Sequence, residues 1–162
     1  MLIGILSDTH DALARTERAV DQLIACGAGL IVHCGDLTTP EIVATCARRP
    51  FYFVFGNHDC DVVPDLLAAA EAHNATCLKW GGQFNAAGKA IAVAHGHRGS
   101  KVKPLLESEP DYLLSGHFHA AMDWMDGKTR RINPGALFRA SPYTVAILDL
   151  STDTLQFIEV SE

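Results

Sequence analysis

The first half of the chain alternates short apolar runs with segments in which apolar residues recur at helical spacing. A short apolar run indicates a buried strand, and spacing of three to four residues indicates a helix packed against a core. The predicted elements are strand 2–7, a helix through 16–24, strand 30–33, helix 40–48, strand 51–55 and helix 61–73. Thr39, Pro40 and Gly27 have the residue types preferred at the ends of such helices. This order predicts a parallel sheet with right-handed crossovers.

The second half is richer in strands. Residues 83–85 and 90–94, 122–125 and 129–132, and 144–150 and 155–160 form three predicted hairpins, with a short helix at 101–107 and a strand at 112–115. Asp126-Gly127 is a typical tight hairpin turn. We therefore expect one α/β domain over residues 1–162, with a second sheet packed on the first and helices on the two outer faces.

Composition narrows the class of protein. The chain has 162 residues, 48% hydrophobic and 20% charged, which is typical of a globular domain. No apolar run approaches the roughly 20 residues of a membrane helix, and the N-terminus lacks the features of a signal peptide. The five cysteines have no C-x-x-C spacing, so we expect reduced and mostly buried thiols, with Cys26 and Cys46 on core-facing helix positions. These features predict a cytoplasmic protein without a membrane segment.

Five loops that follow predicted strands carry aspartate, asparagine or histidine. They are Ser7-Asp8-Thr9-His10, His33-Cys34-Gly35-Asp36, Gly56-Asn57-His58-Asp59, His95-Gly96-His97 and Gly116-His117-Phe118-His119. Loops at the carboxyl ends of strands build the active sites of α/β sheets, so these loops are expected to meet in one crevice.

The residue types in these loops suit transition metals. Carboxylate, amide and imidazole groups together form a mixed oxygen and nitrogen ligand shell, which fits Mn, Fe, Co or Zn better than Ca or Mg. The Asp-x-His and His-x-His spacings place both side chains of each pair on one side of an extended segment. Each motif alone is weak, but five in order at strand ends are specific.

The ordered motifs resemble those of the calcineurin-like metallophosphoesterase superfamily. The short chain and the segment Ile132-Asn133-Pro134-Gly135 resemble its small bacterial and archaeal phosphodiesterase branch, which includes the retromer-subunit fold. The resemblance covers nearly the whole chain and implies a four-layer α/β/β/α sandwich of two mixed sheets with outer helices.

The resemblance also implies two divalent transition-metal ions, with manganese favoured and Fe, Zn, Co or Ni as alternatives. By this resemblance the first ion is held by Asp8, His10, Asp36 and His119, and the second by Asp36, Asn57, His95 and His117. Asp36 would bridge the ions, and His58 would face the substrate phosphate as the catalytic residue. Members of the small branch often carry cysteine in place of His58, whereas the wider superfamily carries histidine.

Three further residues in or beside these loops have open roles. His97 is favoured as a hydrogen-bonding partner of a ligand over a direct role in orienting phosphate. Asp59 is a candidate for either support of the ligands or contact with substrate. Arg98 could line the substrate rim with Lys101 and Lys103, although a solvated face is the favoured interpretation of that run.

The expected function is hydrolysis of a small phosphodiester, and of monoesters as a second activity, by in-line attack of a hydroxide that bridges the two metals. A nucleotide phosphatase or other phosphomonoesterase is the main alternative. A non-catalytic scaffold, as in the retromer subunit, is disfavoured because the ligand set is complete. A net charge of −6 without a basic stripe argues against long nucleic acid as a partner. Assembly into a homo-oligomer is left open.

Overall fold

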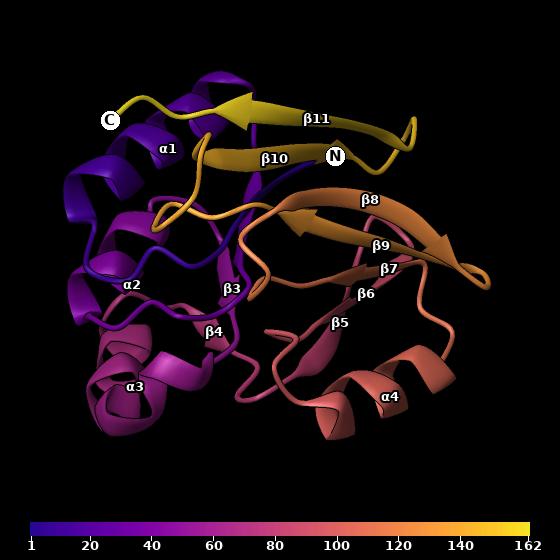
Figure 1. The fold of residues 1–162 in the computed structure, drawn as a ribbon, viewed down its shortest axis with the longest axis horizontal. Coiled ribbons are helices and arrows are strands. Elements are labelled where there is room, and N and C mark those ends of the chain that lie inside the picture. Colours follow the sequence, from indigo (N-terminus) through magenta and orange to yellow (C-terminus); the bar gives the residue numbers. More distant parts are fainter.

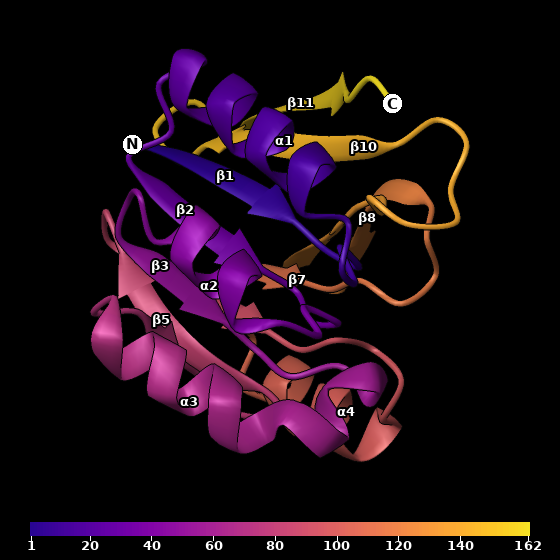
Figure 2. The same ribbon diagram turned by 90° about the vertical axis from the view of Figure 1, so that its left-hand side faces the viewer.

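Two mixed β-sheets lie face to face between two layers of helices in the computed structural model, which describes residues 1–162 (Figure 1 and Figure 2). Helices α1 (Leu13–Ala25), α2 (Pro40–Cys46) and α3 (Val63–Ala72) cover the outer face of the first sheet. Helix α4 (Gly99–Glu107) lies on the far side of the second sheet. The expected four-layer α/β/β/α sandwich is confirmed.

The first sheet has the strand order β11-β10-β1-β2-β3-β4. Its strands are β1 (Leu2–Leu6), β2 (Leu30–His33), β3 (Phe51–Phe53), β4 (Thr76–Cys77), β10 (Thr144–Asp149) and β11 (Thr154–Glu159). Strands β1 to β4 are parallel, as the βαβαβ pattern predicts, whereas β10 and β11 add an antiparallel hairpin at the β1 edge. The sheet is therefore mixed.

The second sheet has the order β5-β6-β7-β9-β8. Its strands are β5 (Gly82–Ala86), β6 (Lys89–Val93), β7 (Tyr112–Leu114), β8 (Ala121–Asp126) and β9 (Thr129–Pro134). Strands β6, β7 and β9 run parallel, and the hairpin partners β5 and β8 form the antiparallel edges. The parallel centres of both sheets direct their carboxyl ends to the same side of the molecule.

The core has two parts because successive side chains of a strand point to opposite faces. Leu30 and Val32 of β2 pack between the sheets, whereas Ile31 packs against the helices. Strands buried on both faces read as continuous apolar runs, which is why this region of the sequence shows no alternation.

Several local predictions need correction. The sequence did not indicate β4 or the 3₁₀ helix η1 (Asn57–Val62), because both are too short for a periodic pattern. The cysteines are unpaired as expected, but the prediction that most are buried is wrong, since only Cys34 and Cys46 are buried. Cys26 follows the last residue of α1 as its C-cap and is exposed. No helix combines the length and apolarity needed to cross a bilayer.

Candidate metal centre

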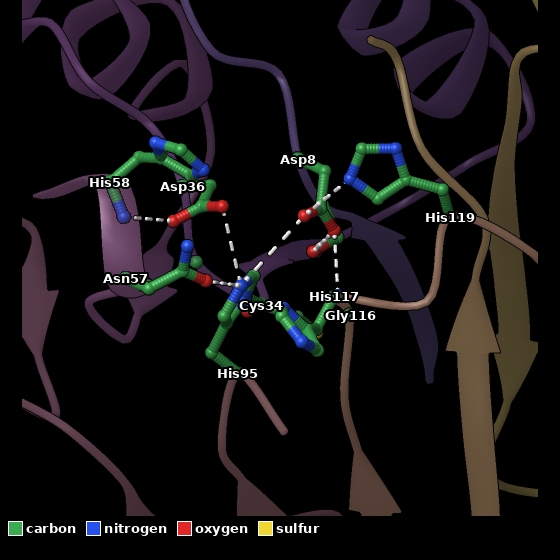
Figure 3. A network of polar contacts seen from close by, with 12 residues as sticks. Asp8, Cys34, Asp36, Asn57, His58, His95, Gly116, His117 and His119 are labelled. Atoms are coloured by element: carbon green, nitrogen blue, oxygen red, sulfur yellow. Dashed lines mark hydrogen bonds and ion pairs between the residues drawn. The ribbon is translucent and has the colours of Figure 1, made fainter. Parts of the chain in front are cut away.

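The five motif loops meet at the carboxyl ends of β1, β2, β3, β6 and β7 (Figure 3). Two hydrogen bonds connect loops of different sheets directly. The backbone N–H of His117 donates to Asp8 Oδ2 at 3.0 Å, and His95 Nδ1 donates to the carbonyl oxygen of Cys34 at 2.8 Å. The convergence expected from the strand-end positions is therefore present, with both sheets contributing.

An unusual backbone conformation is shared by most of the predicted ligands. Non-glycine residues rarely adopt positive φ, and such strain persists mainly at functional sites. The five ligands with positive φ are Asp8 (51°), His10 (48°), Asp36 (60°), His117 (70°) and His119 (54°). The turns that follow β1, β2 and β7 thus direct these side chains inward at a conformational cost.

Close packing around the loops requires glycine at two positions. A Cβ atom at Gly56 would collide with the carboxylate of Asp36, and one at Gly116 would collide with Ser7 Oγ and the Asp8 carboxylate. These glycines let the loops after β3 and β7 approach the two aspartates.

Asp8 is fully buried, and only one of its two carboxylate oxygens is hydrogen-bonded. Oδ2 accepts hydrogen bonds from Ser7 Oγ at 2.6 Å and from the His117 backbone at 3.0 Å. Oδ1 has no hydrogen-bond partner, although it lies 3.2 Å from His119 Nε2 and 3.8 Å from His95 Nε2. A buried, unsatisfied carboxylate oxygen is costly, and a cation at this position would remove that cost.

The tautomers of His95 and His119 also favour a cation at this position. His119 Nδ1 contacts the carbonyl oxygen of Arg139 at 3.3 Å, and His95 Nδ1 contacts that of Cys34, so each Nδ1 must carry the proton. In the neutral rings, each Nε2 then presents a lone pair. His95 Nε2 faces Asn57 Oδ1 at 3.1 Å and Asp36 Oδ2 at 3.3 Å, as Figure 3 shows. A nitrogen lone pair directed at an oxygen atom is repelled by it unless a proton or a metal ion lies between them.

The pKa values of His95 and Asp36 reflect the contact between these two residues. Burial lowers the pKa of His95, but the hydrogen bond that a protonated Nε2 makes with Asp36 and the charges of Asp8 and Asp36 outweigh burial and raise that pKa. Burial opposes ionisation of Asp36, yet its interactions with His95, the His58 N–H and His10 hold its pKa at about 2. The site therefore attracts positive charge, and its oxygen and nitrogen donors fit divalent transition metals.

Six of the seven predicted ligands are joined by short distances between donor atoms. Two triads have ligand atoms within 4.8 Å of one another, Asp8-His10-His119 and Asp8-Asp36-His95, and Asn57 adjoins the second through His95. The seventh, His117, has its ring centroid 5.2 Å from that of His95. The triads share Asp8, while Asp36 Oδ2 faces His10 at 3.8 Å and His95 at 3.3 Å. Both carboxylates thus lie between the two predicted ligand sets.

His58 has its backbone and side chain in different environments. Its backbone N–H donates to Asp36 Oδ1 at 2.8 Å, whereas its ring is exposed, with the centroid 5.0 Å from that of His10. The ring lines a surface cavity of about 340 Å³. The cavity is lined by His10, Asp36, Asn57, His58, His117, His119, Phe138 and Arg139.

Asp59 supports the ligand loops through hydrogen bonds to their backbone. Its buried carboxylate accepts three backbone N–H groups, from Gly56 at 2.7 Å, Asp36 at 2.9 Å and Thr38 at 2.8 Å. Burial raises the pKa of Asp59, while the three N–H donors act in the opposite direction. Asp59 therefore ties the loop after β3 to the loop after β2 and does not line the cavity.

The structure places His97 and Arg98 outside the cavity. Both ring nitrogens of His97 lack a partner, so the hydrogen bond expected from it is absent, and its ring packs 5.2 Å from that of His95. Burial and the nearby His95 and Arg98 lower the pKa of His97 to about 4. The Arg98 guanidinium lies 4.5 Å from the ring centre of Trp80.

Sequence reasoning missed Phe138 and Arg139. Both lie in the loop between β9 and β10, where no ligand-type spacing marks them. In the nearby Asn133-Pro134-Gly135 segment, Asn133 donates from Nδ2 to the Gly116 carbonyl at 2.8 Å. That bond supports the loop carrying His117 and His119.

The chain resembles known proteins in sequence and in fold. The family model for the calcineurin-like phosphoesterase superfamily domain matches residues 1–153. An archaeal phosphodiesterase shares the fold with a TM-score of 0.87 and 23% identity, over 98% of this chain and 99% of that one. Yfce, a phosphoesterase from E. coli, aligns with a TM-score of 0.70 and 19% identity over 99% and 100% of the two chains. Zinc-bound Vps29 from Entamoeba histolytica aligns with a TM-score of 0.61 and 16% identity over 98% and 99%.

Among curated protein sequences, none matches the chain significantly. These three structural neighbours are each below 25% identity, so they establish the fold alone. The family match covers almost the whole chain, including every motif loop. The chain therefore belongs to the calcineurin-like phosphoesterase superfamily.

Proposed function

We propose that the protein is a hydrolase of small phosphate esters, with phosphodiesters preferred, and that it uses two divalent transition-metal ions. One observation carries the proposal: the buried Asp8 Oδ1 has no hydrogen-bond partner and faces the Nε2 atoms of two histidines. This arrangement suits a cation, and it adjoins the cavity that would admit the ester. Manganese is the favoured ion, with Fe, Zn, Co or Ni as alternatives.

The seven predicted ligands would hold the two ions in two overlapping sets. Asp8, His10, Asp36 and His119 would hold one ion, and Asp36, Asn57, His95 and His117 the other. When bound, such ions neutralise phosphoryl oxygens and lower the pKa of water. Asp36, with its pKa held at about 2, remains ionised throughout the neutral range.

His58 would act on the ester itself. Its ring is exposed in the cavity and makes no side-chain hydrogen bond, so it is free to reach the substrate. A water molecule attacks phosphorus opposite the leaving oxygen and releases one proton to solvent, while the protonated ring of His58 donates a proton to the leaving oxygen as its bond to phosphorus breaks. His58 also balances negative charge in the transition state.

The cavity limits the size of substrate that the site can admit. The cavity of about 340 Å³ is open to solvent at its rim, where His58 and Arg139 are exposed. A small ester, mono- or diester, would fit such a site. The net charge of −6 disfavours binding of long nucleic acid.

The decisive experiment compares the hydrolysis of two esters by protein of known metal content. The protein is stripped with EDTA and assayed with bis-p-nitrophenyl phosphate and p-nitrophenyl phosphate, before and after addition of Mn²⁺. We expect no turnover without metal, restored turnover with Mn²⁺ and a higher kcat/KM for the diester. Full activity in EDTA would contradict metal dependence, and a higher kcat/KM for the monoester would identify a phosphomonoesterase.

A further inference from the structure

Two residues complete the wall of the cavity without belonging to the ligand set or to the η1 helix. Phe138 and Arg139 lie in the loop that connects β9 of the second sheet to β10 of the first. Phe138 is the sole hydrophobic residue of the lining, and its ring centroid lies 4.2 Å from that of His10. This loop therefore contributes a non-ligand face to the cavity.

The guanidinium group of Arg139 has no protein acceptor. Of the chain's eight arginines, six donate side-chain hydrogen bonds to carbonyl or carboxylate oxygens. The other two are Arg98, which lies over Trp80 away from the cavity, and Arg139. Arg139 thus brings a full positive charge and five N–H donors to the cavity, and no protein acceptor binds these donors.

The backbone of Arg139 is fixed beside the ligands. Its carbonyl oxygen accepts from His119 Nδ1 at 3.3 Å, which directs His119 Nε2 toward Asp8. Its φ of 46° is in the left-handed region, and its guanidinium carbon lies 5.0 Å from the ring centre of Phe138. The aromatic contact thus holds the charged group beside Phe138, which also lines the cavity.

We propose that Arg139 is a substrate-binding residue whose guanidinium group binds the non-bridging oxygens of the ester phosphate, with Phe138 as the surface on which it rests. The planar guanidinium matches two phosphate oxygens at once, and its charge never titrates. This inference rests on the proposed phosphoesterase function, because it assigns a partner for the substrate of that same site. Arg139 and His58 would then contact the phosphate from separate segments of the chain.

Two variants distinguish the effect of the positive charge of Arg139 from the effect of its paired hydrogen-bond donors. Arg139→Met removes the charge and all side-chain donors while approximately retaining side-chain length. Arg139→Lys retains the charge but cannot make the bidentate hydrogen bond of a guanidinium group. Both retain the backbone carbonyl that His119 uses. Arg98→Met is the matched control, because Arg98 is also exposed and unpaired but lies outside the cavity.

The first readout is hydrolysis of bis-p-nitrophenyl phosphate by Mn²⁺-loaded protein. Loss of a charge-assisted hydrogen bond to the phosphate should lower the kcat/KM of Arg139→Met by about 10- to 100-fold. The kcat/KM of Arg139→Lys should lie between those of the parent and Arg139→Met. Arg98→Met should keep the parent value. Metal content and thermal midpoint, measured on the same samples, should match the parent because Arg139 is neither a ligand nor buried.

The second readout needs no turnover. Calorimetric titration of inorganic phosphate into the Mn²⁺-loaded protein should give a Kd that rises about 10-fold or more in Arg139→Met and is unchanged in Arg98→Met. Equal phosphate affinity for parent and Arg139→Met would overturn the inference, as would absence of phosphate binding by the parent. A parent that hydrolyses neither ester would refute the proposed function, and the titration would still decide whether Arg139 binds phosphate.

Discussion

The carboxylate of Asp8 accepts the backbone N–H of His117 at 3.0 Å, which joins residues 109 positions apart in the chain. Asp8 follows β1 of the first sheet and His117 follows β7 of the second, so this bond crosses from one sheet to the other. It uses Oδ2 and leaves Oδ1 facing His119 and His95. A single carboxylate thereby holds the two halves of the site together and remains available as a ligand.

Asp36→Ala should reduce metal content the most. One of its oxygens faces His10 and His95, a histidine from each proposed ligand set, so its removal weakens both positions. Elemental analysis should show loss of both ions, whereas His117→Ala should lose mainly one. Asp65→Ala, at an exposed position of α3, should bind metal as the parent does. Retention of two ions per chain by Asp36→Ala would exclude a bridging role.

His58→Ala should lower kcat by about 10²- to 10⁴-fold, the range for loss of a general acid or charge-stabilising group. Metal content should remain at the parent level because the His58 side chain is not among the proposed ligands. The loss should be larger for alkyl phosphodiesters than for p-nitrophenyl esters, since an alkoxide needs protonation to leave.

The matched control for His58 is His73→Ala, because His73 is an exposed histidine at the C-cap of α3. Turnover and metal content are measured on the same preparation of each variant. Unchanged kcat on both classes of ester would remove His58 from the mechanism.

Asp59→Asn should destabilise the protein by about 3 kcal/mol, because the amide has one acceptor oxygen where the carboxylate satisfies three backbone N–H groups. Urea unfolding of the metal-free protein measures the change. Asp61→Asn, an exposed substitution in the same 3₁₀ helix, should stay within about 0.5 kcal/mol of the parent. Equal stability of the two variants would show that the Asp59 hydrogen bonds contribute little.

Stability of the metal-free protein should fall with acid because of His33. Burial and, secondarily, the neighbouring His95 lower the pKa of His33 from 6.5 to about 3. Its Nδ1 accepts the Gly35 N–H, and its Nε2 donates to Thr9 Oγ1, so the folded ring is neutral. Below pH 6.5 the unfolded chain binds a proton that the folded chain does not, and stability decreases until the pH approaches the folded pKa.

The expected contribution of His33 is a loss of about 2 kcal/mol between pH 7 and pH 5. Unfolding free energies of the parent and His33→Gln are compared at these two pH values in EDTA. Other titrating groups are common to both proteins, so their effect cancels in the difference between the two decreases. Equal decreases would show that His33 is not the responsible group.

Much of the fold could be predicted from local pattern. The βαβαβ order, the hairpins and the short helix before β7 each follow from periodicity within a few neighbouring residues. The strand-end motifs contain all seven candidate ligands, which the family resemblance singled out. Elements without a period of their own were missed. Strand β4 exists because Tyr52 and Phe53 of β3 provide a pairing partner for Thr76 and Cys77.

The details of the site depended on tertiary contacts. The sequence indicated that Asp8 and His119 belong to one site, but the unpaired Asp8 Oδ1 and the tautomer of His119 follow from groups that folding brings together. It also suggested that His97 makes a hydrogen bond, and packing leaves its ring nitrogens without one. Arg139 carries no motif, and only the course of the β9–β10 loop brings it to the cavity. Periodicity and motif spacing are local properties of the chain, whereas hydrogen-bond satisfaction and cavity walls depend on residues distant in sequence, so only the folded structure decides them.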